Sequence, residues 1–177
     1  YCLEEVSDHT MALLLACARK ITRINNVVKQ GSWYESRIFT TPQFKLRGQT
    51  LGLVGFGRIA RTVVRKAQGF GLRVIVYDPY LSEASAQGHY VELVDLDTLL
   101  QESDYVSVHA PLTKENRHMF TLDKFKKMKP TAFFINTARG GLVDEQALHT
   151  AITEGYIAGA GLDVLETEPP PSDNPLL

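Results

Sequence analysis

The sequence offers little that would point to a membrane, a nucleic acid or an oxidising compartment. Its two cysteines, Cys2 and Cys17, fit neither a disulfide framework nor a metal-site spacing. The formal net charge is −1 and the basic residues are spread along the chain, which argues against a nucleic-acid surface. No apolar run is long enough to span a bilayer, and no signal peptide opens the chain. We therefore expect a cytoplasmic protein with no metal, membrane or nucleic-acid partner.

The size and the two ends of the chain bear on its organisation. It has 177 residues, 44% of them hydrophobic, which suits one domain with a core or a piece of a larger protein. It starts without Met, almost directly in a helical pattern, and it stops in a proline-rich loop. We expect a segment of a longer polypeptide.

A glycine loop follows the first apolar strand pattern, and a helical pattern follows the loop. The segment Gly55-Phe-Gly-Arg-Ile-Ala60 matches the G-x-G-x-x-A form of a dinucleotide-binding turn. Gly55 permits the tight turn, and Gly57 leaves room for a pyrophosphate to approach the backbone. The start of the helix directs free N–H groups and a positive dipole end at the phosphates. The predicted cofactor contacts here are Gly55, Gly57, Arg58 and Ile59.

An acidic residue ends the second strand pattern. Asp78 follows Ala60 at close to the roughly 20-residue spacing expected of the carboxylate that binds the adenosine ribose. Its charge would repel a 2′-phosphate, which favours NAD over NADP. Arg58 and Arg73 lie nearby in the sequence and weaken that preference. Strand, glycine loop, helix and distant acid together predict a dinucleotide site.

The alternation of strand and helix patterns from residue 51 onward predicts the fold. We expect an α/β, Rossmann-type, doubly wound parallel sheet over residues 51–177. The expected strands are 51–54, 73–77, 90–92, 105–108, 132–135 and 157–164. The expected helices are 58–69, 95–102, 121–128 and 144–154, with a small turn region at 82–88.

Residues 1–50 form a separate expected element, a long N-terminal helix and an arm. Apolar residues keep helical spacing from Val6 to about Gln30. The following segment, 31–50, has no clear period but contains Trp33, Tyr34, Phe39 and Phe44. These aromatics either bury themselves against a second subunit or fold back on their own domain.

Polar residues follow several of the expected strands. In an open parallel sheet, ligands bind outside the carboxyl ends of the strands, so topology brings these residues to one edge. Arg139 sits between small residues after the fifth strand and can hold a carboxylate with two parallel hydrogen bonds. The alternative is a surface arginine paired with Asp144 or Glu145. None of the five histidines stands out as a catalytic base, although His109 is placed to border an adenosine pocket or simply to pack.

These residues together resemble the D-isomer-specific 2-hydroxyacid dehydrogenases. The resemblance runs nearly end to end, and Asn136-Thr-Ala-Arg-Gly-Gly141 is its most specific motif. The other matching segments are the glycine loop and those at 77–80, 109–112 and 161–169. The segment Tyr77-Asp-Pro-Tyr-Leu-Ser82 is also similar to the branch with the C-terminal binding protein corepressors, and phosphoglycerate and glycerate dehydrogenases are other relatives of this kind.

The resemblance implies a role for individual residues. Arg139 would hold the substrate's carboxylate and keto oxygen, and Glu168 would orient and keep protonated a histidine that donates a proton to the keto oxygen. Asp163 would bind the nicotinamide carboxamide. The residues implied to line the cofactor are Ala110, Pro111, Leu112, Asn116, Thr137, Ala138 and Arg139. The long helix and arm imply a homodimer.

Two family features are missing from this chain. The family's histidine lies beyond the glutamate, yet no histidine follows Glu168, and the family's separate substrate domain is absent. We expect this polypeptide to bind NAD but not to turn over a 2-keto acid alone, whereas its full-length parent would be an NAD-dependent 2-hydroxyacid dehydrogenase. An NAD-sensing corepressor-like protein is the alternative. A formate- or phosphite-oxidising relative is a third interpretation, and the position of Glu168 disfavours formate oxidation.

Overall fold

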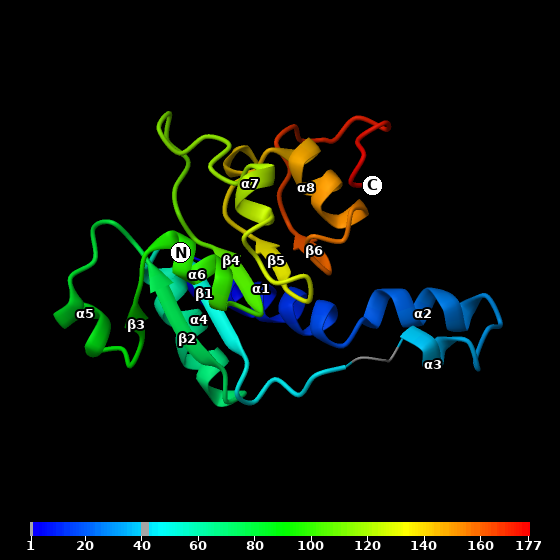
Figure 1. Ribbon diagram of the computed structural model, residues 1–177, viewed down its shortest axis with the longest axis horizontal. Coiled ribbons are helices and arrows are strands. Elements are labelled where there is room, and N and C mark those ends of the chain that lie inside the picture. Colours follow the sequence, from blue (N-terminus) through cyan, green and yellow to red (C-terminus); the bar gives the residue numbers. More distant parts are fainter. Residues whose placement is uncertain (1, 40–42) are drawn as a thin grey trace.

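The computed structural model describes residues 2–39 and 43–177, and its centre is a twisted parallel sheet (Figure 1). Six strands lie in the order β3-β2-β1-β4-β5-β6, and every neighbouring pair is parallel. From β1 to β3 the strands are added toward one side of the sheet, and from β4 to β6 toward the other. This order is that of a doubly wound dinucleotide-binding fold, so the predicted fold class is confirmed. The strands are β1 Thr50–Val54, β2 Arg73–Tyr77, β3 Glu92–Leu93, β4 Tyr105–Val108, β5 Phe133–Asn136 and β6 Gly159–Leu162.

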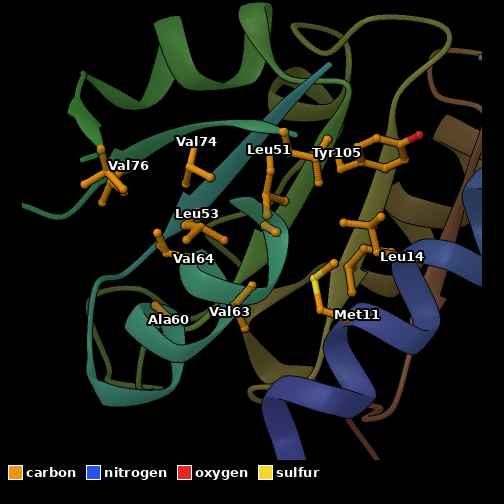
Figure 2. Close-up of a cluster of buried hydrophobic side chains, with 14 of the residues drawn as sticks. Met11, Leu14, Leu51, Leu53, Ala60, Val63, Val64, Val74, Val76 and Tyr105 are labelled. Carbon is orange, nitrogen blue, oxygen red and sulfur yellow. The ribbon is translucent and has the colours of Figure 1, made fainter. Parts of the chain in front are cut away.

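Helices cover both faces of the sheet, which is why its strands are apolar on both sides. One core contains Leu51 and Leu53 of β1 together with residues of α1 and α4, and Figure 2 shows Met11, Leu14 and Val63 converging on it. The other core lies on the opposite face and includes Val54 and residues of α6, α7 and α8. The helices after β1 are α4 Arg58–Gly69, α5 Glu83–Gln87, α6 Leu96–Glu102, α7 Leu122–Phe125, the single 3-10 turn η1 Gly140–Leu142, and α8 Glu145–Thr153.

The predicted single N-terminal helix is wrong, because the chain forms α1 Leu3–Ala18 and then α2 Ile21–Lys29. Lys20 breaks the helix with a left-handed backbone, at φ 53°. Helix α1 packs on the sheet as far as Ala18, whereas α2 has no buried residue and projects away from the body (Figure 1). The apolar period runs on through the break, so the sequence pattern alone did not reveal it.

Helix α1 is anchored to the rest of the fold by polar contacts as well as by its apolar face. The Lys66 ammonium of α4 donates to the Ser7 hydroxyl at 2.6 Å and to the Asp8 carboxylate at 2.7 Å. The hydroxyls of Thr10 and Thr137 lie 2.9 Å apart in a buried hydrogen bond, which joins α1 to the loop after β5. The N-terminal half of α1 therefore has a fixed position beside the carboxyl edge of the sheet.

The aromatic arm does not fold back on the sheet in the described part of the chain. The exposed fractions of Trp33, Tyr34 and Ile38 are 67%, 79% and 71%. Helix α3, Ser36–Phe39, lies beside α2 away from the body (Figure 1). Residues 40–42 of the predicted arm lie outside the described residues.

Smaller differences from the predicted elements have local causes. The expected turn at 82–88 contains the short helix α5, because the Ser82 hydroxyl accepts the Ser85 N–H and caps it. The last strand is shorter than predicted and ends at Leu162. Of the helices in the described ranges, none has the length and apolar composition that a membrane span requires.

Candidate nucleotide-binding site

The glycine loop makes a sharp turn at the end of β1. Gly55 has φ 93°, and a Cβ there would lie 2.8 Å from the Ala110 nitrogen, so only glycine fits. The Gly55 N–H donates to the Tyr77 carbonyl oxygen at 2.8 Å, which holds the turn against β2. A Cβ on Gly57, in contrast, would meet no atom within 4 Å. The loop is therefore tight where the strands meet and open where a ligand would approach.

The start of α4 suits an anion. Gly57 is the N-cap residue, and no side chain caps the helix there. The N–H groups of the first turn are therefore free, at the positive end of the helix dipole. Arg58 is exposed at this end, and Ile59 is half-buried. This open, uncapped helix start fits the pyrophosphate of a dinucleotide.

Asp78 lies beside the glycine loop, as the motif requires. One of its carboxylate oxygens accepts the Phe56 N–H at 2.8 Å, and the other accepts the Tyr80 N–H at 2.9 Å. Arg73 is at the opposite end of β2 and pairs with Glu92 and Glu102. Arg73 therefore does not oppose the charge of Asp78, which suits a free ribose rather than a 2′-phosphate.

A cleft of about 730 Å³ lies at the carboxyl edge of the sheet. The loops after β4 and β5 line it together with α4, and the predicted residues Ile59, Ala110, Pro111, Leu112, Thr137, Ala138 and Arg139 all face it. Its other lining residues are Cys2 and Val6 of the N-terminal segment, and His109. The contribution of α1 was missed, because its apolar period predicts packing and gives no sign of a cleft wall.

Six predicted cofactor contacts lie outside this lining: Gly55, Gly57, Arg58, Asp78, Asn116 and Asp163. The Asn116 side chain donates to the Pro111 carbonyl oxygen and accepts the Thr113 N–H, both at 2.7 Å, so it shapes the loop after β4. Asp163 directly follows β6, and its N–H donates to the Asn136 carbonyl oxygen at 3.0 Å. That places Asp163 on the same sheet edge. Its carboxylate lies 3.2 Å from the imidazole Nε2 of His9 on α1.

Arg139 and Glu168 border a second, smaller hollow of about 290 Å³. The exposed Arg139 guanidinium donates to the Ala138 carbonyl oxygen at 2.6 Å. Its proposed surface partners are engaged elsewhere: Asp144 caps α8 through the Ala147 N–H, and Glu145 accepts the Glu166 N–H. Leu112 and Arg139 line both this hollow and the larger cleft, so the two spaces adjoin.

The loop that carries Glu168 is held by several contacts. The two Glu145 carboxylate oxygens accept the Glu166 N–H at 2.6 Å and the Asn174 side-chain amide at 2.8 Å. Glu166 pairs in turn with Arg117 and with His118, whose Nε2 lies 2.8 Å away. Glu168 accepts the Leu165 N–H at 2.9 Å. The sequence showed no partner for His118, because His118 and Glu166 are far apart along the chain.

His109 closes β4 and lines the cleft as a neutral group. Burial lowers the pKa of this imidazole from 6.5 to about 4, and its Nε2 lies 3.0 Å from the Ser107 hydroxyl. At neutral pH it therefore adds no charge beside the glycine loop. The contact with Ser107 gives His109 a structural role, and His109 also lines the cleft.

His109 makes the fold acid-sensitive. Between pH 6.5 and pH 4 the unfolded chain binds a proton at His109 that the folded chain excludes, so stability falls as pH falls through this window. The unfolding free energy should fall between pH 7 and pH 4.5. We expect this fall to be about 2 kcal/mol smaller in His109→Gln than in the unsubstituted chain. Urea unfolding of both proteins at the two pH values measures this. Equal losses in the two proteins would contradict a buried neutral His109.

No group of three His, Cys, Asp or Glu side chains within residues 2–39 and 43–177 is arranged to hold a metal ion. The polar groups at this edge include an uncapped helix start, the Asp78 carboxylate and the exposed Arg139 guanidinium. Residues 11–177 match the family model described as D-isomer specific 2-hydroxyacid dehydrogenase, NAD binding domain. The chain belongs to this family. NAD is accordingly the cofactor of the domain, as predicted.

Individual members of the family agree with this assignment. The chain is 46% identical to a glyoxylate reductase of Korarchaeum cryptofilum, over 98% of this chain and 53% of that protein. The crystal structure of Rhodotorula graminis D-mandelate dehydrogenase matches with a TM-score of 0.88 at 32% identity, over 96% of this chain and 51% of that one. An NAD-complexed family member from Lactobacillus delbrueckii ssp. bulgaricus matches with a TM-score of 0.82 at 33% identity, over 93% of this chain and 49% of that one.

The chain spans about half the length of these relatives. All three are named as dehydrogenases or reductases, so they lend no support to the corepressor-like alternative.

Proposed function

We propose that the chain is the NAD-binding domain of an oxidoreductase that interconverts a D-2-hydroxy acid and a 2-keto acid. The observation that carries this proposal is the adjacency of the two hollows. Arg139 borders both the cleft that Ile59 of α4 lines and the hollow that Glu168 lines. A carboxylate held by Arg139 would therefore lie next to a cofactor held in the cleft.

Each predicted residue has a proposed task. The first turn of α4 would hold the pyrophosphate, Asp78 the adenosine ribose, and Asp163 the nicotinamide carboxamide. Bound NADH would supply the hydride. The Arg139 guanidinium would fix the carboxylate and polarise the keto oxygen of the substrate. Glu168 would orient a proton-donating histidine contributed from outside this chain.

The remaining predicted cofactor contacts would line the dinucleotide. We propose that Gly55, Gly57, Arg58 and Ile59 surround the pyrophosphate. The apolar and small residues of the loops after β4 and β5 would cover the rest of the dinucleotide. They are Ala110, Pro111, Leu112, Thr137 and Ala138, with Asn116 shaping the first loop.

A small 2-keto acid is the proposed substrate class. The hollow beside Arg139, of about 290 Å³, has room for the carboxylate and carbonyl groups that such acids share. Of the relatives described above, one is named for glyoxylate, which is a 2-keto acid, and another for D-mandelate, a 2-hydroxy acid whose oxidation gives a 2-keto acid. Glyoxylate, hydroxypyruvate and pyruvate form the first panel to assay.

Arg139→Lys in a full-length protein that carries this domain tests the activity. Lysine keeps the charge but loses the planar, two-pronged fit to a carboxylate. We expect kcat/KM for the preferred keto acid to fall by about 100-fold or more, with NADH affinity changed by less than about twofold. Stopped-flow reduction and NADH titration measure the two quantities. An unaltered kcat/KM would contradict the role of Arg139, and no turnover of any keto acid by the unsubstituted protein would contradict the function.

We propose that residues 1–50 are a dimerisation element and that the protein acts as a homodimer. Trp33, Tyr34 and Ile38 expose large apolar side chains on an arm that projects from the body, a patch of the kind that marks protein contacts (Figure 1). Sedimentation equilibrium tests this proposal. Twice the 19.7 kDa chain mass supports it, and a monomer at micromolar concentration contradicts it.

We also propose a cytoplasmic location. Both cysteines, Cys2 and Cys17, are free thiols, and burial raises the pKa of Cys17 to about 11, so that thiol stays protonated and unreactive. Free thiols of this kind are typical of reducing compartments. Fractionation of cells that express the parent protein would test this, and recovery outside the cytoplasm would contradict it.

A further inference from the structure

His9 is held beside the carboxyl edge of the sheet by its place on α1. Its imidazole Nε2 lies 3.2 Å from a carboxylate oxygen of Asp163, and both side chains are 48% exposed. The next residue on α1, Thr10, forms the buried hydrogen bond to Thr137. The Asp163 backbone is fixed at the edge by its bond to Asn136. His9 therefore lies on α1, and Asp163 is the first residue after β6.

Charge at this position distinguishes the two redox states of the cofactor. The nicotinamide ring carries a positive charge in NAD+ and none in NADH, while the rest of the dinucleotide keeps the same charge. A carboxylate alone beside the ring would favour NAD+ over NADH. An imidazolium next to that carboxylate would cancel the preference or reverse it. Histidine is the side chain that ordinarily changes its charge between pH 5 and pH 8.

The other charged groups near His9 keep their charge over this range. On α1, Glu5 lies one turn earlier, and Glu4 and Asp8 pair with Lys66 of α4. The loop after β5 contributes Arg139, and the carboxylates and cations of these residue types do not titrate between pH 6 and pH 8.

Two further titratable groups line the adjoining cleft. Burial keeps His109 neutral above about pH 4, so it does not change charge in the same range. Cys2 also lines the cleft, and it is present in every protein compared below, so its contribution cancels.

We propose that His9 sets the redox-state preference of the site: the protonated imidazole favours NADH, and the neutral imidazole favours NAD+. Replacement of NAD+ by NADH would then draw a proton onto His9, and the reverse exchange would release it. This inference rests on the proposed role of Asp163 at the nicotinamide, and it adds a residue of α1 to the determinants of cofactor affinity.

Calorimetric titration of this chain with NADH and with NAD+ at pH 6 and pH 8, at one ionic strength, tests the proposal. For the unsubstituted chain we expect the ratio Kd(NAD+)/Kd(NADH) to be about three- to fivefold higher at pH 6 than at pH 8, the size expected of a half-exposed ion pair. In His9→Gln the ratio should be the same at both pH values. His149→Gln is the matched control, since His149 lies on α8 and lines neither the cleft nor the hollow; it should keep the pH dependence.

The remaining outcomes distinguish a failure of the proposed role of His9 from a failure of the proposed cofactor contacts. A pH-independent ratio in the unsubstituted chain, or an equal pH dependence in His9→Gln, would overturn the role of His9 while leaving the cofactor site intact. Absence of NADH binding by folded chain at either pH would instead overturn the proposed cofactor contacts. Melting curves of His9→Gln establish that it is folded.

Discussion

Gly57→Ala is expected to lower NADH affinity by at least about 100-fold, or about 2.7 kcal/mol, without unfolding the protein. Gly57 has φ −74° and ψ −171°, which alanine adopts readily, and its added Cβ would meet no protein atom within 4 Å. The same Cβ would occupy the space through which a pyrophosphate approaches the start of α4. Binding should therefore be lost while the fold is kept.

Calorimetry and thermal unfolding together measure this effect. The unfolding free energy should change by no more than about 1 kcal/mol, the scale of an N-cap substitution. Gly69→Ala is the control, because Gly69 also has open space around its Cβ position but lies at the other end of α4. It should bind NADH as the unsubstituted chain does. Unchanged NADH affinity in Gly57→Ala would mean that the pyrophosphate lies elsewhere.

Gly140→Ala is expected to have the opposite profile and to destabilise the fold itself. A Cβ on the buried Gly140 would lie 2.0 Å from the Leu165 carbonyl carbon and 2.3 Å from the Glu166 nitrogen. Both are backbone atoms, and Glu145 holds the Glu166 N–H from the other side. We expect a loss of about 3 kcal/mol of unfolding free energy and a fall in Tm of roughly 10 °C.

This contact is also what keeps Arg139 and Glu168 at one hollow, since their loops touch at Gly140 and Leu165. Gly69→Ala again serves as the control and should melt at or slightly above the unsubstituted temperature. A Gly140→Ala protein with unchanged Tm would show that the loop after β6 is free to move away, and that the two loops are not fixed relative to each other.

The parts of the site that sequence alone predicted are those with a local signature. The glycine loop needs Gly55 for its positive φ, and Asp78 directly follows the next strand. The residue type and spacing of both therefore predict their place in the site. The strands themselves are short apolar runs that lie between polar, glycine or proline residues typical of turns and loops. For this reason β2, β4 and α4 begin and end where the pattern predicts.

The parts that sequence did not predict depend on contacts between distant residues. His118 and Glu166 are 48 residues apart, and His9 meets Asp163 only because α1 crosses the end of β6. The break at Lys20 was hidden because the apolar period continues through it, although the buried residues of these two helices end at Ala18. Such pairings follow from tertiary packing and leave no local pattern to read.

The central claim is that the dinucleotide binds along the carboxyl edge of the sheet, from the glycine loop to Asp163. Amide chemical-shift mapping of the chain during NADH titration tests it most directly. We predict that the largest shifts fall at Gly57, Asp78 and Asp163, and in the loops after β4 and β5. Shifts concentrated instead at the other sizeable hollow, about 580 Å³ between α1, α2 and β6 and lined by Leu13, Lys20 and Phe133, would contradict the claim.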